Sequence, residues 1–173
     1  TTEIYPLSLH DALPICESWR YAIDVNLMGV VHMVEAALPA MRAQGHGRIA
    51  LLMPLSGLLP APYEAVCSAT HAAARALIES LRYELWDEKI ECASACLDGV
   101  FAPDFELGAD RAAAEAANAV LEGLAQNAPV VIWPESAQDL VETCGPSTGE
   151  RQTCLLKDAR TRKAGIRTKG AYV

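Results

Sequence analysis

Apolar side chains recur every three or four positions between residues 17 and 45. They stand at positions 23, 27, 30, 31, 34, 38 and 41. This spacing predicts an amphipathic helix, because residues three and four apart lie on the same face of a helix. Ser18 is a residue suited to cap the start of that helix, and Gly45 is suited to end it.

Short apolar runs and further helical patterns alternate along the rest of the chain. The expected strands are 47–54, 89–97 and 129–134, and the expected helices are 67–86, 109–127 and 135–143. Proline and glycine mark the intervening stretches 55–66 and 98–108 as loops. Alternating helices and strands predict an α/β fold with a parallel sheet joined by right-handed crossovers.

The N-terminal residues do not share this regularity. Residues 1–15 contain two prolines and show neither helical nor strand periodicity. Their stretch SLHDALPI, residues 8–15, is encoded by TCC CTA CAC GAC GCT CTT CCG ATC and resembles a translated sequencing adapter. We therefore expect residues 1–16 to be an artefact or an irregular N-terminus, 17–145 a partial domain, and 146–173 a poorly ordered basic tail.

Charge is distributed unevenly along the chain. The formal net charge is -8, yet residues 147–173 carry seven Lys and Arg against Glu150 and Asp158. The acidic body argues against nucleic-acid binding as the main task. The basic tail is typical of a solvated terminus, with an anion-binding arm as the alternative.

Three sequence features indicate the cellular compartment: six cysteines, no secretion signal and no long apolar run. The cysteines at 16, 67, 92, 96, 144 and 154 form no CxxC pair and no metal-ligand spacing. No unbroken run approaches the ~20 apolar residues of a membrane span. We expect a cytoplasmic protein with reduced thiols, no metal and no membrane partner.

Several segments resemble one family in order and spacing. "VNLMG" (25–29), "GRIALLMPLSG" (47–57), "CSATHAAARALIESL" (67–81) and "KIECASACLDGV" (89–100) together resemble a short-chain dehydrogenase/reductase over residues 17–142. The resemblance implies the C-terminal part of a Rossmann-like doubly wound parallel sheet, with about three strands and flanking helices. It also implies NAD or NADP as cofactor and a small carbonyl or alcohol substrate.

The resemblance places four catalytic positions in this sequence. The catalytic Asn is kept as Asn26, whereas the places of Ser, Tyr and Lys hold Pro54, Cys67 and His71. The loop that lies against the nicotinamide reads Asp98, Gly99 and Val100, and the threonine that usually follows falls at Pro103.

These replacements bear on the family chemistry. That chemistry needs a phenol whose pKa an adjacent ammonium lowers, and a hydroxyl that polarises the substrate carbonyl. Proline has no side-chain donor, cysteine is a poor one, and histidine is neutral for much of the time near pH 7. No GxGxxG or GxxxGxG occurs in the sequence, so the cofactor-binding half is absent from this chain. We therefore expect weak activity or none.

Two alternatives remain open. Cys67 and His71 are four residues apart on one helix face, where a histidine can activate a thiol, with Asn26 as an orienting group. Tyr63, four residues before Cys67, is a less favoured substitute phenol. The other alternative is a non-enzymatic module that forms homo-oligomers through helices 18–44 and 67–86, as the resemblance implies. In either case the open sheet edge predicts low solubility of the 173-residue chain.

Overall fold

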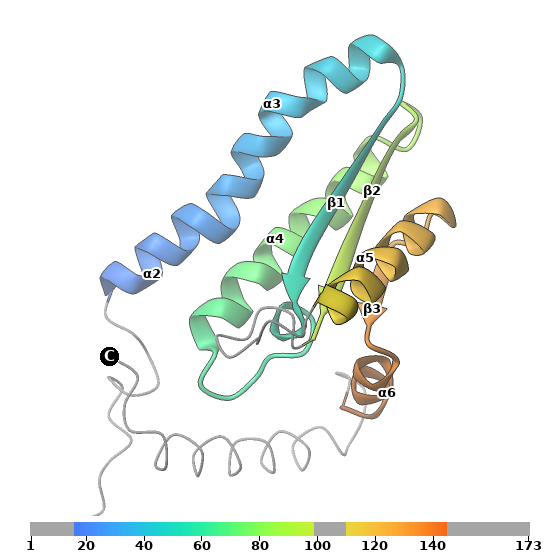
Figure 1. The fold of residues 1–173 in the computed structure, drawn as a ribbon. Coiled ribbons are helices and arrows are strands. Elements are labelled where there is room, and N and C mark those ends of the chain that lie inside the picture. The colour runs from blue at the N-terminus through green and yellow to red at the C-terminus, as the bar shows by residue number, and fades with distance from the viewer. Residues whose placement is uncertain (1–15, 99–109, 145–173) are drawn as a thin grey trace, which may run out of the picture.

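The computed structural model describes residues 16–98 and 110–144. Helices cover a small sheet in these residues (Figure 1). The elements in chain order are α2 (Cys16–Ala22), the π-helix η1 (Ile23–Met28), α3 (Gly29–Gln44), β1 (Gly47–Pro54), the 3-10 turn η2 (Leu55–Gly57), α4 (Ala65–Glu84), β2 (Ile90–Leu97), α5 (Asp110–Ala125), β3 (Val130–Trp133) and α6 (Glu135–Cys144).

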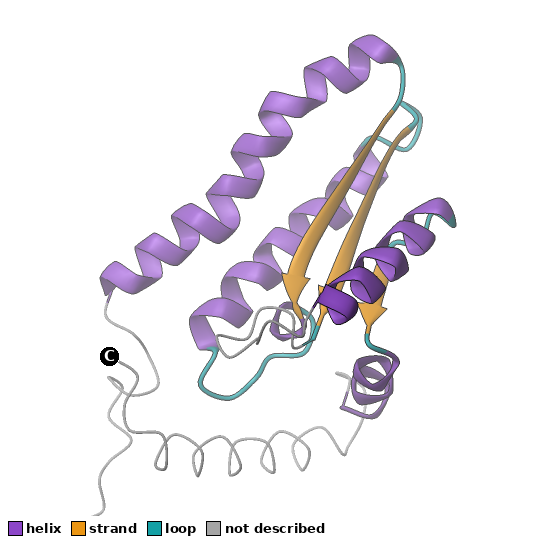
Figure 2. Cartoon of the chain, viewed as in Figure 1, coloured by secondary structure: helices purple, strands orange, loops and turns teal. Residues whose placement is uncertain are grey.

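The expected strands are all present and all parallel. Their order is β1-β2-β3, with Gly47 opposite Ile90 and Ser94 opposite Val130. Helical layers lie on both sides of this sheet, as Figure 2 shows. The arrangement confirms the α/β class and the partial Rossmann-like sheet that the sequence predicts.

Alternate side chains of β2 pack against different helices. Ile90 and Cys92 pack with residues of α3 and α4, and Cys96 packs with residues of α6. Ala95 and Leu97 face the other way and pack against Ala116 and Val120 of α5. Helices α3, α4 and α6 therefore lie on one face of the sheet, and α5 lies on the other.

This placement of helices corrects the predicted chirality. Both crossovers, β1-α4-β2 and β2-α5-β3, join parallel strands and advance in the same direction across the sheet. Because α4 and α5 lie on opposite faces (Figure 1), the two crossovers have opposite hands. The expectation that every crossover is right-handed is therefore wrong for one of them, because Ala116 and Val120 of α5 pack on the face of the sheet opposite α4.

The first predicted helix is continuous but not uniform. It runs through α2, η1 and α3, and Gly45 ends it with φ of 76°, the left-handed conformation that glycine adopts without strain. Between Ile23 and Met28 the helix widens to π geometry. Short π segments of this kind occur frequently at functional sites.

By length and composition alone this helix could cross a membrane. Within Ser18–Gln44 an 18-residue window reaches a mean hydropathy of 1.3, although charged residues interrupt the segment and leave no long unbroken apolar run. A core helix of a soluble protein passes the same test. Val30, Val34 and Leu38 pack against the buried cluster around Ile78 from partly buried positions, and no residue of the apolar window is itself buried.

Candidate functional site

The end of β1 and the start of α4 lie close together and form the candidate site. Pro54 is the last residue of β1, and η2 follows it at once. Ser56, in this turn, is 5% exposed. After a loop, α4 begins at Ala65, two residues before the predicted start, so Cys67 lies within its first turn. This turn therefore places the Ser56 hydroxyl against the head of α4.

Cys67 and His71 contact each other on one face of α4. The Sγ atom of Cys67 lies 3.4 Å from Nδ1 of His71, and Nδ1 lies 2.9 Å from the main-chain oxygen of Cys67. The hydrogen bond with His71 lowers the pKa of the Cys67 thiol against the opposing effect of burial. The same hydrogen bond raises the pKa of His71. The pair is therefore biased toward a thiolate and an imidazolium.

Ser56 is a third member of this cluster. Its Oγ donates to Sγ of Cys67 at 3.7 Å, which also favours the thiolate. The family motif places its serine at Pro54, two residues earlier, and therefore does not identify Ser56. The hydroxyl in "PLSG", beside the strand end, is the signal that could have identified it.

Gly57 allows η2 to lie against α4. A Cβ atom added at Gly57 would lie 2.8 Å from Cβ of His71 and 2.9 Å from Sδ of Met53. These distances are shorter than real Cβ contacts, so glycine is required by close approach. The contact fixes the position of the His71 backbone relative to the turn.

Asn26 lies in the π segment and reaches the same helix from another side. Its Nδ2 donates to Oγ1 of Thr70 at 3.0 Å, and Oγ1 of Thr70 donates to the main-chain oxygen of Val66 at 2.8 Å. Thr70 is 3% exposed and precedes His71 in the chain. The structure thus brings Asn26 to α4 beside the Cys67–His71 pair, although no direct bond from Asn26 to either residue occurs among the described interactions.

The predicted nicotinamide-facing loop is described at one residue. Asp98 is exposed directly after β2, and its main-chain N–H donates to the oxygen of Trp133 at 2.8 Å. Gly99, Val100 and Pro103 lie outside the described residues. Leu97, the residue before Asp98, is in register with Pro54. Asp98 and Pro54 therefore lie at the same carboxyl-terminal edge of the parallel strands.

The described residues contain no group of three or more His, Cys, Asp or Glu side chains that could hold a metal ion. Tyr63, the less favoured phenol, lies in the loop before α4 with φ of 65° and is 39% exposed. Among the described interactions, no hydrogen bond joins Tyr63 to Cys67 or His71.

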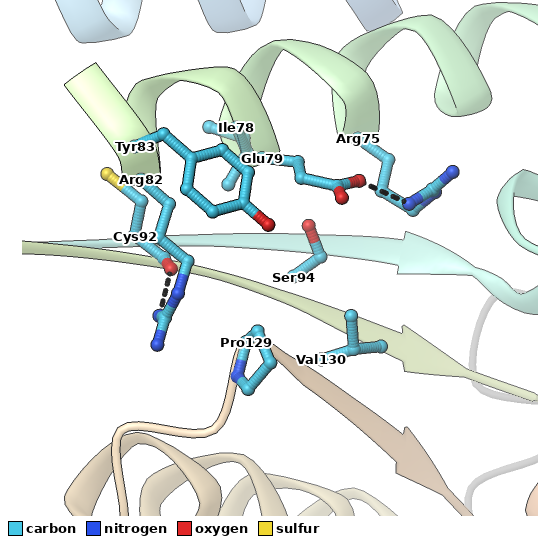
Figure 3. A pocket seen from close by; sticks show the side chains of 9 residues that line it. All are labelled: Arg75, Ile78, Glu79, Arg82, Tyr83, Cys92, Ser94, Pro129 and Val130. Atoms are coloured by element: carbon cyan, nitrogen blue, oxygen red, sulfur yellow. Dashed lines mark hydrogen bonds and ion pairs between the residues drawn. The ribbon is translucent and has the colours of Figure 1, made fainter.

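A separate cavity of about 180 Å³ lies between α4, β2 and the start of β3. Figure 3 shows its side chains, among them Arg75, Glu79, Arg82, Cys92, Ser94 and Val130. Arg82 is engaged there, because it donates to the main-chain oxygens of Cys92 and Asn127. None of Asn26, Pro54, Cys67 and His71 lines this cavity, so it is distinct from the candidate site.

Comparison with solved structures identifies the fold. A short chain dehydrogenase from Burkholderia cenocepacia, solved with NADP, superposes with a TM-score of 0.70 at 24% identity, over 82% of this chain and 62% of that one. A short-chain dehydrogenase from Streptomyces avermitilis superposes with a TM-score of 0.63 at 18% identity, over 92% of this chain and 66% of that one. At such identities the likeness shows the fold alone.

Curated relatives agree with this fold. A hydroxysteroid 11-beta-dehydrogenase 1-like protein of Gallus gallus is 31% identical over 127 residues, which is 68% of this chain and 44% of the relative. An uncharacterized oxidoreductase of Staphylococcus epidermidis is 42% identical over 69 residues, 40% of this chain and 30% of the relative. The chain thus spans less than half the length of these two relatives.

The sequence profile of one family covers more than half of the chain. It is the profile of the short chain dehydrogenases, and it matches residues 11–106. The match begins inside the adapter-like stretch and includes β1, α4, β2 and the cluster at Cys67. The chain belongs to the short chain dehydrogenase family.

Proposed function

We propose that this chain is part of an NAD(P)-dependent oxidoreductase homologue whose catalytic centre is degenerate, so that the whole protein is weakly active or inactive. The observation that carries the proposal is the contact between Cys67 Sγ and His71 Nδ1 at the head of α4. Two side chains that would have to serve the substrate instead bond each other. Neither supplies a phenol, and Pro54 supplies no hydroxyl.

Loss of these groups removes two separate contributions to catalysis. The alcohol or carbonyl oxygen of a substrate has no proton donor of the family type, and no serine polarises it. Ser56 does not compensate in this arrangement, because its hydroxyl is directed at the sulfur of Cys67. Since catalytic groups act together, the loss of three of four leaves little rate acceleration.

The described residues do not by themselves fit a dinucleotide. Asp98 presents an exposed carboxylate where the nicotinamide half would lie, and the sequence holds no glycine-rich turn to seat the phosphates. Binding of NAD or NADP therefore needs residues outside this chain.

The sheet offers a place for those further residues. Within the described residues β1 pairs with β2 alone, which leaves its other edge open. Leu52 projects from β1 on the face opposite α4 and is 51% exposed. The exposed Leu52 side chain and the open edge of β1 support a longer native protein. Further strands and helices of that protein would cover this side chain and this edge.

A second copy of the chain is the proposed partner, with the two helical segments 18–44 and 67–86 as the interface. Exposed apolar side chains support this choice: Tyr21 and Met33 are each 71% exposed, and Tyr83 is 68% exposed. No membrane and no nucleic-acid partner is proposed, and a cytoplasmic location remains a prediction.

The experiment uses the longer protein that includes the cofactor-binding half. Tryptophan fluorescence is titrated with NADH and NADPH, and light scattering is recorded on the same sample. The degenerate oxidoreductase predicts a saturable cofactor signal from a dimer with little or no turnover of alcohols or ketones. Dimers without a cofactor signal would instead support the non-enzymatic module.

A further inference from the structure

The sulfur of Cys67 receives two hydrogen bonds from side chains of different elements. Ser56 donates from η2 at 3.7 Å, and His71 approaches from the next turn of α4 at 3.4 Å. Cys67 itself lies in the first turn of this 20-residue helix, where unpaired main-chain N–H groups favour negative charge. Three features therefore favour a thiolate at one place.

The hydrogen bonds also determine which nitrogen of His71 carries a proton. The main-chain oxygen of Cys67 can only accept, and Nδ1 lies 2.9 Å from it. Nδ1 therefore holds a hydrogen, which it shares between this oxygen and Sγ. A second proton on Nε2 turns the ring into an imidazolium whose N–H already faces the sulfur.

Among the four cysteines whose burial the structure describes, accessibility singles out Cys67. Cys92, Cys96 and Cys144 are 1%, 0% and 0% exposed, whereas Cys67 is only partly buried. Burial raises the pKa of Cys92, and raises that of Cys96 to about 11, so both remain thiols near neutral pH. The chain thus contains its own inert thiols for comparison.

We propose that Cys67 and His71 form a nucleophilic thiolate–imidazolium pair that adds to α,β-unsaturated carbonyl compounds. The sulfur forms a bond to the β carbon, and the π electrons of the C=C bond move toward the carbonyl. The imidazolium of His71 then gives its Nε2 proton to the α carbon through a water molecule and becomes the neutral ring that keeps its hydrogen on Nδ1. The product is a saturated thioether of Cys67, and no oxidant or reductant takes part.

The choice of substrate class follows from the proton donor beside the sulfur. Addition to a conjugated alkene needs a proton at the product, which His71 is placed to supply. Exchange with a disulfide expels a thiolate and needs no such proton. The proposal is independent of the cofactor and of the missing catalytic residues, because the reaction uses side chains of this chain alone.

The test is adduct formation on the 173-residue chain without any nicotinamide cofactor. The probes are 2-cyclohexenone, which needs a proton, and iodoacetamide, which does not. Peptide mapping by mass spectrometry reports each cysteine separately, including Cys16 and Cys154. We expect Cys67 to react with cyclohexenone at pH 6 about tenfold faster than glutathione does, since more of it is thiolate. Cys92 and Cys96 should remain unmodified.

Two variants separate the roles of His71. In His71→Gln we expect both probes to react more slowly with Cys67. The factor by which the rate with cyclohexenone falls should be at least about threefold larger than the factor for iodoacetamide, because proton delivery is also lost. Cys96→Ser, a change at a buried and inert thiol, should leave both rates unchanged while circular dichroism verifies the fold of each variant.

Three results would overturn the proposal. The first is that His71→Gln slows the reactions of Cys67 with the two probes by the same factor. The second is that Cys67 reacts with cyclohexenone at pH 6 no faster than glutathione does. The third is that glutathione disulfide modifies Cys67 faster than cyclohexenone does. Glu64, the residue before α4, opposes the thiolate electrostatically. A Glu64→Gln variant should therefore react faster, not slower, than the wild type. Turnover of ketones by the longer protein would refute the proposed function and leave these outcomes unaffected.

Discussion

Asn26 Nδ2 donates a hydrogen bond to Oγ1 of Thr70 at 3.0 Å and so joins the π segment to the helix that carries Cys67 and His71. Thr70 is almost fully buried, and its hydroxyl also donates to the main-chain oxygen of Val66. Asn26, the predicted catalytic asparagine, is thus engaged in holding two helices together. Asn26 therefore contributes to the packing of these two helices, whatever the chemistry of the site.

Thr70→Val tests the stabilising role of this bond. The change keeps the shape of the side chain but removes the hydroxyl, which leaves Nδ2 of Asn26 without its acceptor. We expect the free energy of unfolding to fall by about 1–2 kcal/mol, measured by urea denaturation. Ser80→Ala, at an exposed position of the same helix, serves as the control and should change stability by less than about 0.5 kcal/mol. Equal effects of both variants would contradict the prediction.

Gly57→Ala tests the close approach of η2 to α4. The new Cβ would collide with His71 and Met53, and we expect a loss of about 1–3 kcal/mol in the free energy of unfolding. In Gly29→Ala the new Cβ meets only the oxygen of Asp24, at 3.8 Å, and the helix should gain up to about 1 kcal/mol. Equal changes in the free energy of unfolding for Gly57→Ala and Gly29→Ala would contradict the close approach of η2 to α4.

Cys67→Ser should lower the pKa of His71. The hydrogen bond with the sulfur is the largest cause that raises this pKa, and a neutral hydroxyl cannot replace a thiolate as acceptor. NMR titration of the His71 ring, assigned with His71→Gln, measures the shift. Cys96→Ser should leave the titration unchanged, and an unchanged titration in Cys67→Ser as well would disprove the ion pair.

The two pKa shifts affect stability with opposite signs. His71 has a raised pKa in the folded protein, so its contribution is fully present below the ordinary value of 6.5 and is lost as pH rises through the folded pKa. Cys67 has a lowered pKa, so its contribution is present above the ordinary value of 9.0 and is lost as pH falls through the folded pKa. His71→Gln should therefore lower the free energy of unfolding more near neutral pH than at pH 10. Urea denaturation at both pH values measures this difference.

Leu52→Lys tests whether the exposed face of β1 is an interface. In the 173-residue chain we expect higher solubility and unchanged circular dichroism, since Leu52 is half exposed there and the lysine can reach water. In the longer protein the same change should lower the melting temperature by several degrees, because the charge would be buried. Leu121→Lys, at a 64% exposed position of α5, is the control and should be neutral in the longer protein. A neutral Leu52→Lys there would argue against a covered face.

Much of the fold could be predicted from the sequence. Strand 47–54 coincides with β1, and helix 109–127 contains α5, because buried apolar runs and helical periodicity are local signals. The boundary at Gly45 was also predictable, since its left-handed φ is readily adopted only by glycine. Family resemblance then proposed Asn26, Pro54, Cys67 and His71 as site positions, an assignment that stays a prediction.

Other features could not be predicted, because they depend on packing between distant segments. The π geometry around Asn26 leaves the apolar spacing nearly unchanged, so periodicity does not reveal it. The hydrogen bond of Ser56 to Cys67 exists because Gly57 lets the turn lie against α4. The opposite hands of the two crossovers follow from the face on which α5 packs, which no local pattern specifies.

The most direct test of the degenerate centre is turnover by the longer protein before and after its catalytic residues are restored. The NADPH-dependent reduction of a panel of ketones is measured for the native protein and for the triple variant Pro54→Ser, Cys67→Tyr, His71→Lys. We predict that the native protein is at least about a thousandfold slower than the triple variant, with both binding the cofactor. A native protein that reduces a ketone at an ordinary enzymatic rate, on the order of 10 per second, would contradict the account.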